Sequence, residues 1–264
     1  MPRALPPTTF SRPQPRERLT VAGAALAAEG VRKRYGAVTA LDDVTLRVAP
    51  GECVALVGES GSGKTTLLRA FNGLTLCDSG RVTVDGADVQ TADLIALRRR
   101  IGYVPQDGGL LPHWTVRRNV QLVPTLRAQP DVAERADAAL LLAGLDAVRY
   151  GARFPRELSG GQRQRVAIAR ALAAHPDAVL LDEPFGALDA ITRGELREAF
   201  AALSQQLRLT TVLVTHDLGE AFALADRVAV FRAGQLEQVD APAELRHAPA
   251  SPYVAMLLAR AGVA

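Results

Sequence analysis

The chain has 264 residues, of which 48% are hydrophobic and 22% charged, proportions that are ordinary for a globular protein. Its net charge is only +3 and aromatic residues make up 5%, which argues against the broad basic surface with interleaved aromatics of a nucleic-acid-binding protein. No apolar run approaches the roughly 20 residues of a membrane-spanning helix, so any work at a membrane would need another subunit to cross it.

The N-terminal segment Met1–Arg18 combines prolines and arginines without an apolar stretch, which is not the pattern of a signal peptide. We interpret residues 1–24 as a disordered leader, with an upstream start codon as the alternative. The two cysteines, Cys53 and Cys77, lack metal-ligand spacing. Nothing in them indicates an oxidising compartment, so a cytoplasmic location is expected.

Strands and helices alternate along the chain after residue 40. Short apolar or alternating segments between turn residues predict strands at 44–48, 53–57, 81–84, 101–104, 178–181, 211–214, 228–231 and 236–239. Apolar residues at helical spacing predict helices at 65–72, from 116, at 132–145, 161–174 and 195–207, and over most of the segment from 241. Buried strands that alternate with helices favour an α/β core with a largely parallel sheet.

The pattern changes between about residues 107 and 160, where helical spacing replaces strands. Thr115 can cap the helix that begins at Val116. We therefore expect a core of residues 25–106 and 161–240, a helical insert at 107–160 and a helical tail at 241–264.

The glycine-rich segment 58–66 follows a buried strand and precedes a helix, which is the context of a phosphate loop. Its backbone N–H groups and the helix N-terminus would form a nest for phosphate oxygens. Lys64 would reach the β- and γ-phosphates of ATP, and the Thr65 hydroxyl would ligate Mg²⁺. The expected ATP-binding residues of this loop are Gly58, Glu59, Ser60, Gly61, Ser62, Gly63, Lys64, Thr65 and Thr66.

Two carboxylates follow the predicted strand at 178–181. Asp182 would emerge at the carboxyl edge of the sheet, where ligands of open α/β sheets bind, and could hold Mg²⁺. Glu183 points to the other face and could polarise a water that attacks the γ-phosphate. Beside a phosphate loop, this pair indicates nucleotide hydrolysis.

The segment Leu158-Ser159-Gly160-Gly161-Gln162 opens a helix, where Ser159 and the following amides could bind a phosphate. The phosphate loop already holds one nucleotide, so a second anion site makes sense if it serves the nucleotide of another copy. With the other motifs, in this order, residues from about Leu26 to Leu258 resemble the nucleotide-binding subunits of ABC transporters. Ser159, Gly160, Gly161 and Gln162 match the signature of that family.

The resemblance implies a P-loop NTPase core, an N-terminal antiparallel β portion and an inserted helical subdomain. It also implies roles for four residues. Tyr35 would stack on adenine, and Gln106 would contact Mg²⁺ and the attacking water. Asp189 would approach the opposite site, and His216 would contact the γ-phosphate.

The partners implied by the family are a second copy, packed head to tail with two ATP molecules between the copies, and two integral membrane permease subunits. An extracytoplasmic substrate-binding protein would act through the permease. The chain would then lie at the inner face of the plasma membrane and hydrolyse ATP. No nucleic-acid partner is expected.

The segments 154–157 and 186–189 look like those of importers. Residues 101–106, 109–116 and 119–124 are similar to importers of osmoprotectants such as glycine betaine, choline or carnitine. The alternative is an importer of amino acids or of nitrate, sulfonate or taurine-like anions. Two other classes, a soluble ABC ATPase of translation or DNA repair and an ordinary P-loop kinase, explain the motifs less well.

Overall fold

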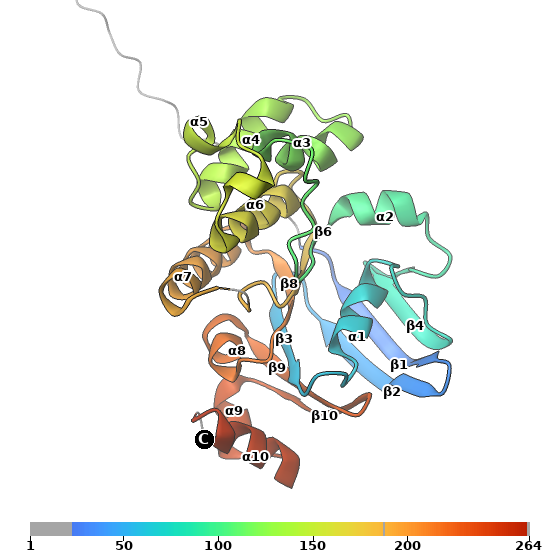
Figure 1. The fold of residues 1–264 in the computed structure, drawn as a ribbon. Coiled ribbons are helices and arrows are strands. Elements are labelled where there is room, and N and C mark those ends of the chain that lie inside the picture. The colour runs from blue at the N-terminus through green and yellow to red at the C-terminus, as the bar shows by residue number, and fades with distance from the viewer. Residues whose placement is uncertain (1–22, 187, 263–264) are drawn as a thin grey trace, which may run out of the picture.

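The computed structural model describes residues 23–186 and 188–262 (Figure 1). The expected leader therefore lies outside the described residues up to residue 22. Ala24 already belongs to the core, since it is 1% exposed and its N–H donates to the Asp177 carbonyl at 2.8 Å.

A mixed sheet of six strands forms the centre of the described part, in the order β10-β9-β3-β8-β7-β6. Every neighbouring pair is parallel except β9 and β10, which form an antiparallel hairpin. The strands β3, β7 and β8 are buried throughout, which explains their continuous apolar sequences. Their bounds are β3 Cys53–Gly58, β6 Ile101–Val104, β7 Ala178–Asp182, β8 Thr210–Val214, β9 Arg227–Arg232 and β10 Gln235–Asp240.

A second, antiparallel sheet confirms the expected N-terminal β portion. Its order is β2-β1-β4-β5, with β1 at Leu26–Tyr35, β2 at Val38–Val48, β4 at Ser79–Val84 and β5 at Ala87–Asp88. Strand β1 has no clear alternation in the sequence. Its pairing with β2 shifts register between Ala28 and Val31, where Gly30 has a φ of 58°, and this irregularity interrupts the period of two.

The helix α1, Lys64–Phe71, lies between the two sheets (Figure 1). Leu67, Leu68 and Phe71 are completely buried, in a core cluster that includes residues of β1, β2, β3 and β4. The phosphate loop before α1 is therefore anchored by both sheets.

The helices α3 to α6 gather in the upper part of Figure 1 around their own apolar cluster. Their bounds are α3 Val116–Leu126, α4 Val132–Leu142, α5 Ala147–Tyr150, a 3₁₀ turn at Pro155–Glu157 and α6 Gly160–Leu172. Thr115 caps α3 as predicted, accepting from the Arg118 N–H at 3.3 Å. Helix α6 also contributes Ile168 and Leu172 to the cluster beside β7, so α6 joins the two parts. The division near residue 160 remains a proposal.

The remaining helices are α2 Leu94–Arg100, α7 Ala190–Leu207, α8 Leu218–Leu224, α9 Pro242–His247 and α10 Pro252–Arg260. Helix α7 begins five residues before the predicted position 195, because Asp189 caps it. Within the described ranges, no helix combines the length and apolar character that crossing a bilayer requires.

Candidate nucleotide-binding site

The loop between β3 and α1 can form because glycine stands at its two tightest positions. Gly58 has a φ of 141° and Gly63 a φ of 106°, which L side chains rarely adopt. A Cβ at Gly58 would collide with the Phe231 carbonyl, and one at Gly63 with the Ala40 carbonyl. The backbone thus turns sharply enough to present its amides at the start of α1.

The ammonium of Lys64 lies across this loop. Its Nζ donates to the carbonyls of Gly58 at 2.8 Å and Glu59 at 2.7 Å, and to Ser62 Oγ at 3.3 Å. Burial lowers the pKa of Lys64, while the carboxylates of Glu183 and Asp182 act in the opposite direction. A cation in this position, with neutral oxygens as its partners, is suited to exchange them for phosphate oxygens.

The predicted magnesium residues Thr65 and Asp182 are brought together. Thr65 Oγ1 donates to Asp182 Oδ1 at 2.8 Å, and the residue Asp182 is only 3% exposed at the end of β7. Arg69 Nη2 lies 3.6 Å from Asp182 Oδ2, and Arg69 Nε donates to Tyr103 Oη at 3.4 Å. Burial raises the pKa of Tyr103, which keeps the phenol neutral.

The oxygens of Thr65 and Asp182 suit Mg²⁺ better than a metal ion that is bound only by protein side chains. The described residues contain no group of three His, Cys, Asp or Glu side chains placed to hold a metal. Mg²⁺ needs no such group, because it commonly binds through one or two carboxylates, water and substrate phosphates. The hydroxyl of Thr65 and the carboxylate of Asp182, in direct contact, are donors of the right kind.

Glu183 is the meeting point of three strand ends. Its Oε2 accepts from Gln106 Nε2 at 3.1 Å, after β6, and lies 3.4 Å from His216 Nδ1, after β8. The Glu183 backbone has a φ of 48°, a left-handed conformation that is uncommon without glycine, and its N–H donates to the Val214 carbonyl at 2.9 Å. Strain of this kind at a strand end is typical of a functional site.

A buried network holds the backbone beside His216. Glu220 is 4% exposed and its Oε2 accepts from Thr215 Oγ1 at 2.6 Å, while Thr215 Oγ1 accepts from the Asp217 N–H at 3.0 Å. Burial raises the pKa of Glu220. Sequence reasoning missed this network. The spacing of Asp217 and Glu220 would have located a helix start but not the buried carboxylate.

Tyr35 lies at the end of β1 and is 51% exposed. Its hydroxyl is 3.3 Å from Thr75 Oγ1, and Lys33 Nζ lies 5.5 Å from the ring centroid. The accessible ring could stack on a base. Its role stays a prediction.

The signature forms the start of α6. Ser159 Oγ accepts from the Gln162 N–H at 3.3 Å and Gln162 Oε1 accepts from the Ser159 N–H at 3.0 Å, a complete capping box. A Cβ at Gly161 would lie 2.5 Å from Thr192 Cγ2, so glycine allows α6 to pack on the start of α7. There Asp189 Oδ1 accepts from the Thr192 N–H at 3.0 Å.

The signature and the phosphate loop do not meet. Among the described residues, no hydrogen bond or ion pair joins 159–162 to 58–66, and Figure 1 shows α6 among the upper helices, away from α1. The structure thus brings together Lys64, Thr65, Gln106, Asp182, Glu183 and His216, and it leaves Ser159, Gly160, Gly161 and Gln162 apart.

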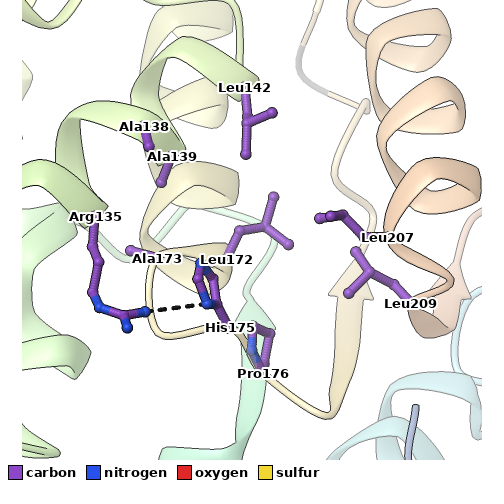
Figure 2. A pocket seen from close by; sticks show the side chains of 10 residues that line it. All are labelled: Arg135, Ala138, Ala139, Leu142, Leu172, Ala173, His175, Pro176, Leu207 and Leu209. Carbon is purple, nitrogen blue, oxygen red and sulfur yellow. Dashed lines mark hydrogen bonds between the residues drawn. The ribbon is translucent and has the colours of Figure 1, made fainter. Parts of the chain in front are cut away.

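A separate cavity of about 50 Å³ lies between α4, the end of α6 and the end of α7 (Figure 2). Its walls are mostly apolar. Arg135 Nη1 lies 3.1 Å from His175 Nδ1, and burial, then the charges of Arg135 and Arg127, lower the pKa of His175. None of the predicted nucleotide-binding residues lines this cavity.

Comparison with known proteins extends these observations. Residues 41–186 match the family model described as ABC transporter. The chain is 44% identical to the choline transport ATP-binding protein OpuBA of Bacillus subtilis, over 87% of the chain and 61% of the relative. It is 45% identical to the glycine betaine/carnitine/choline transport ATP-binding protein OpuCA of the same organism, over 86% and 60%. The chain thus spans about three fifths of the length of these two relatives.

The sulfate/thiosulfate import ATP-binding protein CysA of Nocardia farcinica is 47% identical, over 86% of the chain and 68% of the relative. Among solved structures, the ATP-binding cassette MJ0796, dimeric in a post-hydrolysis state with ADP and Pi, matches with a TM-score of 0.76 and 34% identity. That match covers 82% of this chain and 98% of the other. With matching motifs, fold and relatives, the chain belongs to the ABC transporter family and has the fold of its ATP-binding cassette.

Proposed function

We propose that this chain binds ATP with Mg²⁺ and hydrolyses it as the energising subunit of an ABC importer. The observation that carries the proposal is the position of the Glu183 carboxylate. It contacts Gln106 and His216, and it immediately follows Asp182, which contacts Thr65. The transport ATP-binding proteins among the relatives support the same function.

In this mechanism the loop amides and Lys64 hold the phosphates, and Tyr35 carries the adenine. Thr65, Asp182 and Gln106 would hold Mg²⁺, which neutralises charge on the β- and γ-phosphates when bound. Water attacks the γ-phosphorus and passes a proton to the Glu183 carboxylate as the bond to the β-phosphate oxygen breaks. His216 and Gln106 orient that carboxylate. His216 would also contact the γ-phosphate.

The test is Glu183→Gln, which keeps the shape of the side chain and removes the base. We expect the turnover number to fall about 10²–10⁴-fold, the usual loss for a general base. ATP binding should persist. Dimers that retain ATP should accumulate, which light scattering would measure. Glu198→Gln, at an exposed position of α7, is the matched control. Hydrolysis by the Glu183 variant at the parental rate would exclude Glu183 as the base.

The second copy is part of the proposal, because Ser159, Gly160, Gly161 and Gln162 need a nucleotide that their own phosphate loop does not offer them. Two copies packed head to tail would place each signature on the partner's ATP and Asp189 near the opposite site. The MJ0796 cassette, which is dimeric with ADP and Pi bound, supports the presence of a second copy.

We place the dimer on two integral membrane permease subunits, at the inner, cytoplasmic face of the plasma membrane. An extracytoplasmic substrate-binding protein would deliver the solute to the permease. No nucleic acid takes part in this function. The support is that the relatives are named as ATP-binding proteins of transport and import systems.

For the solute, we propose quaternary amines such as glycine betaine, choline or carnitine. The relatives OpuBA and OpuCA support this class. Sulfate or thiosulfate is a second candidate, because CysA is 47% identical whereas OpuBA and OpuCA are 44% and 45% identical.

The two candidates can be separated by purifying the chain with the permease and binding protein encoded beside it and measuring ATPase activity. Choline, glycine betaine or carnitine should stimulate hydrolysis, and sulfate and thiosulfate should not. Stimulation by sulfate or thiosulfate alone would overturn the first candidate and support the second.

A further inference from the structure

The segment 105–109, which we name the Gln106 loop, is folded tightly onto α6. Gly108 and Gly109 have φ values of 74° and 55°, and the Gly108 N–H donates to the Pro105 carbonyl at 2.8 Å. A Cβ at Gly108 would lie 3.4 Å from Gln164 Oε1 and 3.5 Å from Ala167 Cβ, both on α6. These two left-handed residues turn successive carbonyls toward the same helix.

One side chain of α6 holds both carbonyls. Arg170 Nη1 donates to Gly109 O at 2.6 Å, and Arg170 Nη2 donates to Gly108 O at 2.9 Å. Burial lowers the pKa of this guanidinium, and the nearby charge of Asp107 opposes the shift. A planar guanidinium suits two adjacent acceptors, whereas a lysine ammonium can only satisfy them as a point charge.

The Gln106 loop therefore has two attachments. On one side, Gln106 Nε2 donates to Glu183 Oε2, the proposed base. On the other, Arg170 fixes the loop to α6, the helix whose first residues follow the Ser159 cap. The signature and Gln106 are thus connected through one rigid helix and a pair of hydrogen bonds.

We propose that Arg170 is a positioning residue for ATP hydrolysis: it holds the Gln106 loop on the signature helix, so that Gln106 is placed against Glu183. The inference rests on the proposed ATPase function and adds to it. Arg170 does not contact the reacting atoms and acts through Gln106. A misplacement of about 1 Å in such a group can reduce a rate about 10²-fold.

Arg170→Ala and Arg170→Lys test this inference, with Arg165→Ala as the matched control. Arg165 belongs to the same helix and also donates to a backbone carbonyl, that of Ala143 at 3.2 Å, away from the Gln106 loop. We expect Arg170→Ala to lower kcat about tenfold to hundredfold, with KM for ATP changed little. Arg170→Lys should show a smaller loss and keeps the test valid if the alanine variant does not fold. Arg165→Ala should retain the parental kcat.

A double-mutant cycle with Gln106→Ala decides whether Arg170 acts through Gln106. In that background, Arg170→Ala or Arg170→Lys should cause no further fall in kcat. An additional fall equal to that in the parent, or a parental kcat in both Arg170 variants, would overturn the inference and leave the proposed function intact. A folded, dimeric parent without any ATPase activity would overturn the proposed function, and this inference with it.

Discussion

The two predicted parts of the reaction centre differ in how complete they are. We name them the phosphate-loop half, which contains Lys64, Thr65, Gln106, Asp182, Glu183 and His216, and the signature half, which contains residues 159–162. In the first, side chains from separate segments contact one another: Thr65 Oγ1 donates to Asp182 Oδ1, and Gln106 Nε2 donates to Glu183 Oε2. In the second, the hydrogen bonds of Ser159 and Gln162 among the described residues stay within the capping box and its near surroundings. One half is assembled within a single copy, whereas in the other the N-terminus of α6 makes no hydrogen bond or ion pair with the phosphate loop among the described residues.

We expect the largest effect from a substitution in the phosphate-loop half. Lys64→Ala removes the cation that crosses the loop, and we expect ATPase activity to fall about 10³-fold, as for loss of a preorganised donor to a developing charge. The signature half should be unaffected, although the unfolding temperature without nucleotide should fall, because the carbonyls of Gly58 and Glu59 lose their donor. Parental activity in the folded variant would contradict the placement of the phosphates on Lys64.

Gly161→Ala disturbs the packing of the signature half instead. The added methyl group meets Thr192 Cγ2, and relieving such overpacking typically costs about 1–3 kcal/mol. We expect nucleotide-dependent dimerisation and hydrolysis to be lost, while an isolated copy binds ATP as the parent does. Gly194→Ala in α7 is the control, because its Cβ would meet nothing within 4 Å. If Gly161→Ala weakened ATP binding by isolated copies as strongly as it weakened dimerisation, the two halves would not be separate.

Tyr35→Ala tests whether the phosphate-loop half includes the aromatic ring that would stack on adenine. Loss of base stacking should weaken ATP binding by about 1–3 kcal/mol, measurable by calorimetry. Tyr35→Phe should bind almost as well, because the hydroxyl contributes only a 3.3 Å contact to Thr75. Unchanged binding by the alanine variant would remove Tyr35 from the site.

The smallest effect lies outside both halves, at His175 in the cavity of Figure 2. Its folded-state pKa is below the ordinary value of about 6.5, so the folded protein resists the proton. The stability that neutral His175 contributes is fully present above about pH 6.5, the ordinary pKa of histidine. It is lost as the pH falls from about 6.5 toward the lower pKa of the folded state. Urea unfolding at pH 7.5 and 5.5 should show a smaller loss of stability for His175→Gln than for the parent. ATP hydrolysis at pH 7.5 should not change, and an equal pH dependence in both proteins would contradict this assignment.

Much of the fold follows from local sequence patterns. The buried strands at 53–57, 178–181 and 211–214 were predicted because continuous apolar runs end at recognisable turn residues, and the structure confirms them. Strand β1 was missed because its register shifts break the alternation. The phosphate loop was predictable because its glycines, lysine and threonine are adjacent in the sequence.

The supporting contacts of the site could not be predicted in the same way. Arg170 meets carbonyls 61 and 62 residues away, and Arg69 meets a tyrosine 34 residues away. No local spacing joins such residues, since only the packing of α6 and α1 against the sheet brings them together. The buried Glu220 reads in the sequence as an ordinary helix-start carboxylate, because its burial and its approach to Arg193 of α7, at 3.9 Å, are tertiary properties.

The central claim is that each reaction centre combines the phosphate loop of one copy with the signature of another. It is tested by Ser60→Cys with Ser159→Cys, two exposed positions, in Glu183→Gln protein whose Cys53 and Cys77 are replaced by Ala. With ATP and a mild oxidant, we predict a disulfide between copies, seen as a covalent dimer in a non-reducing gel. A disulfide within single chains, or no disulfide in the presence of ATP, would contradict the claim.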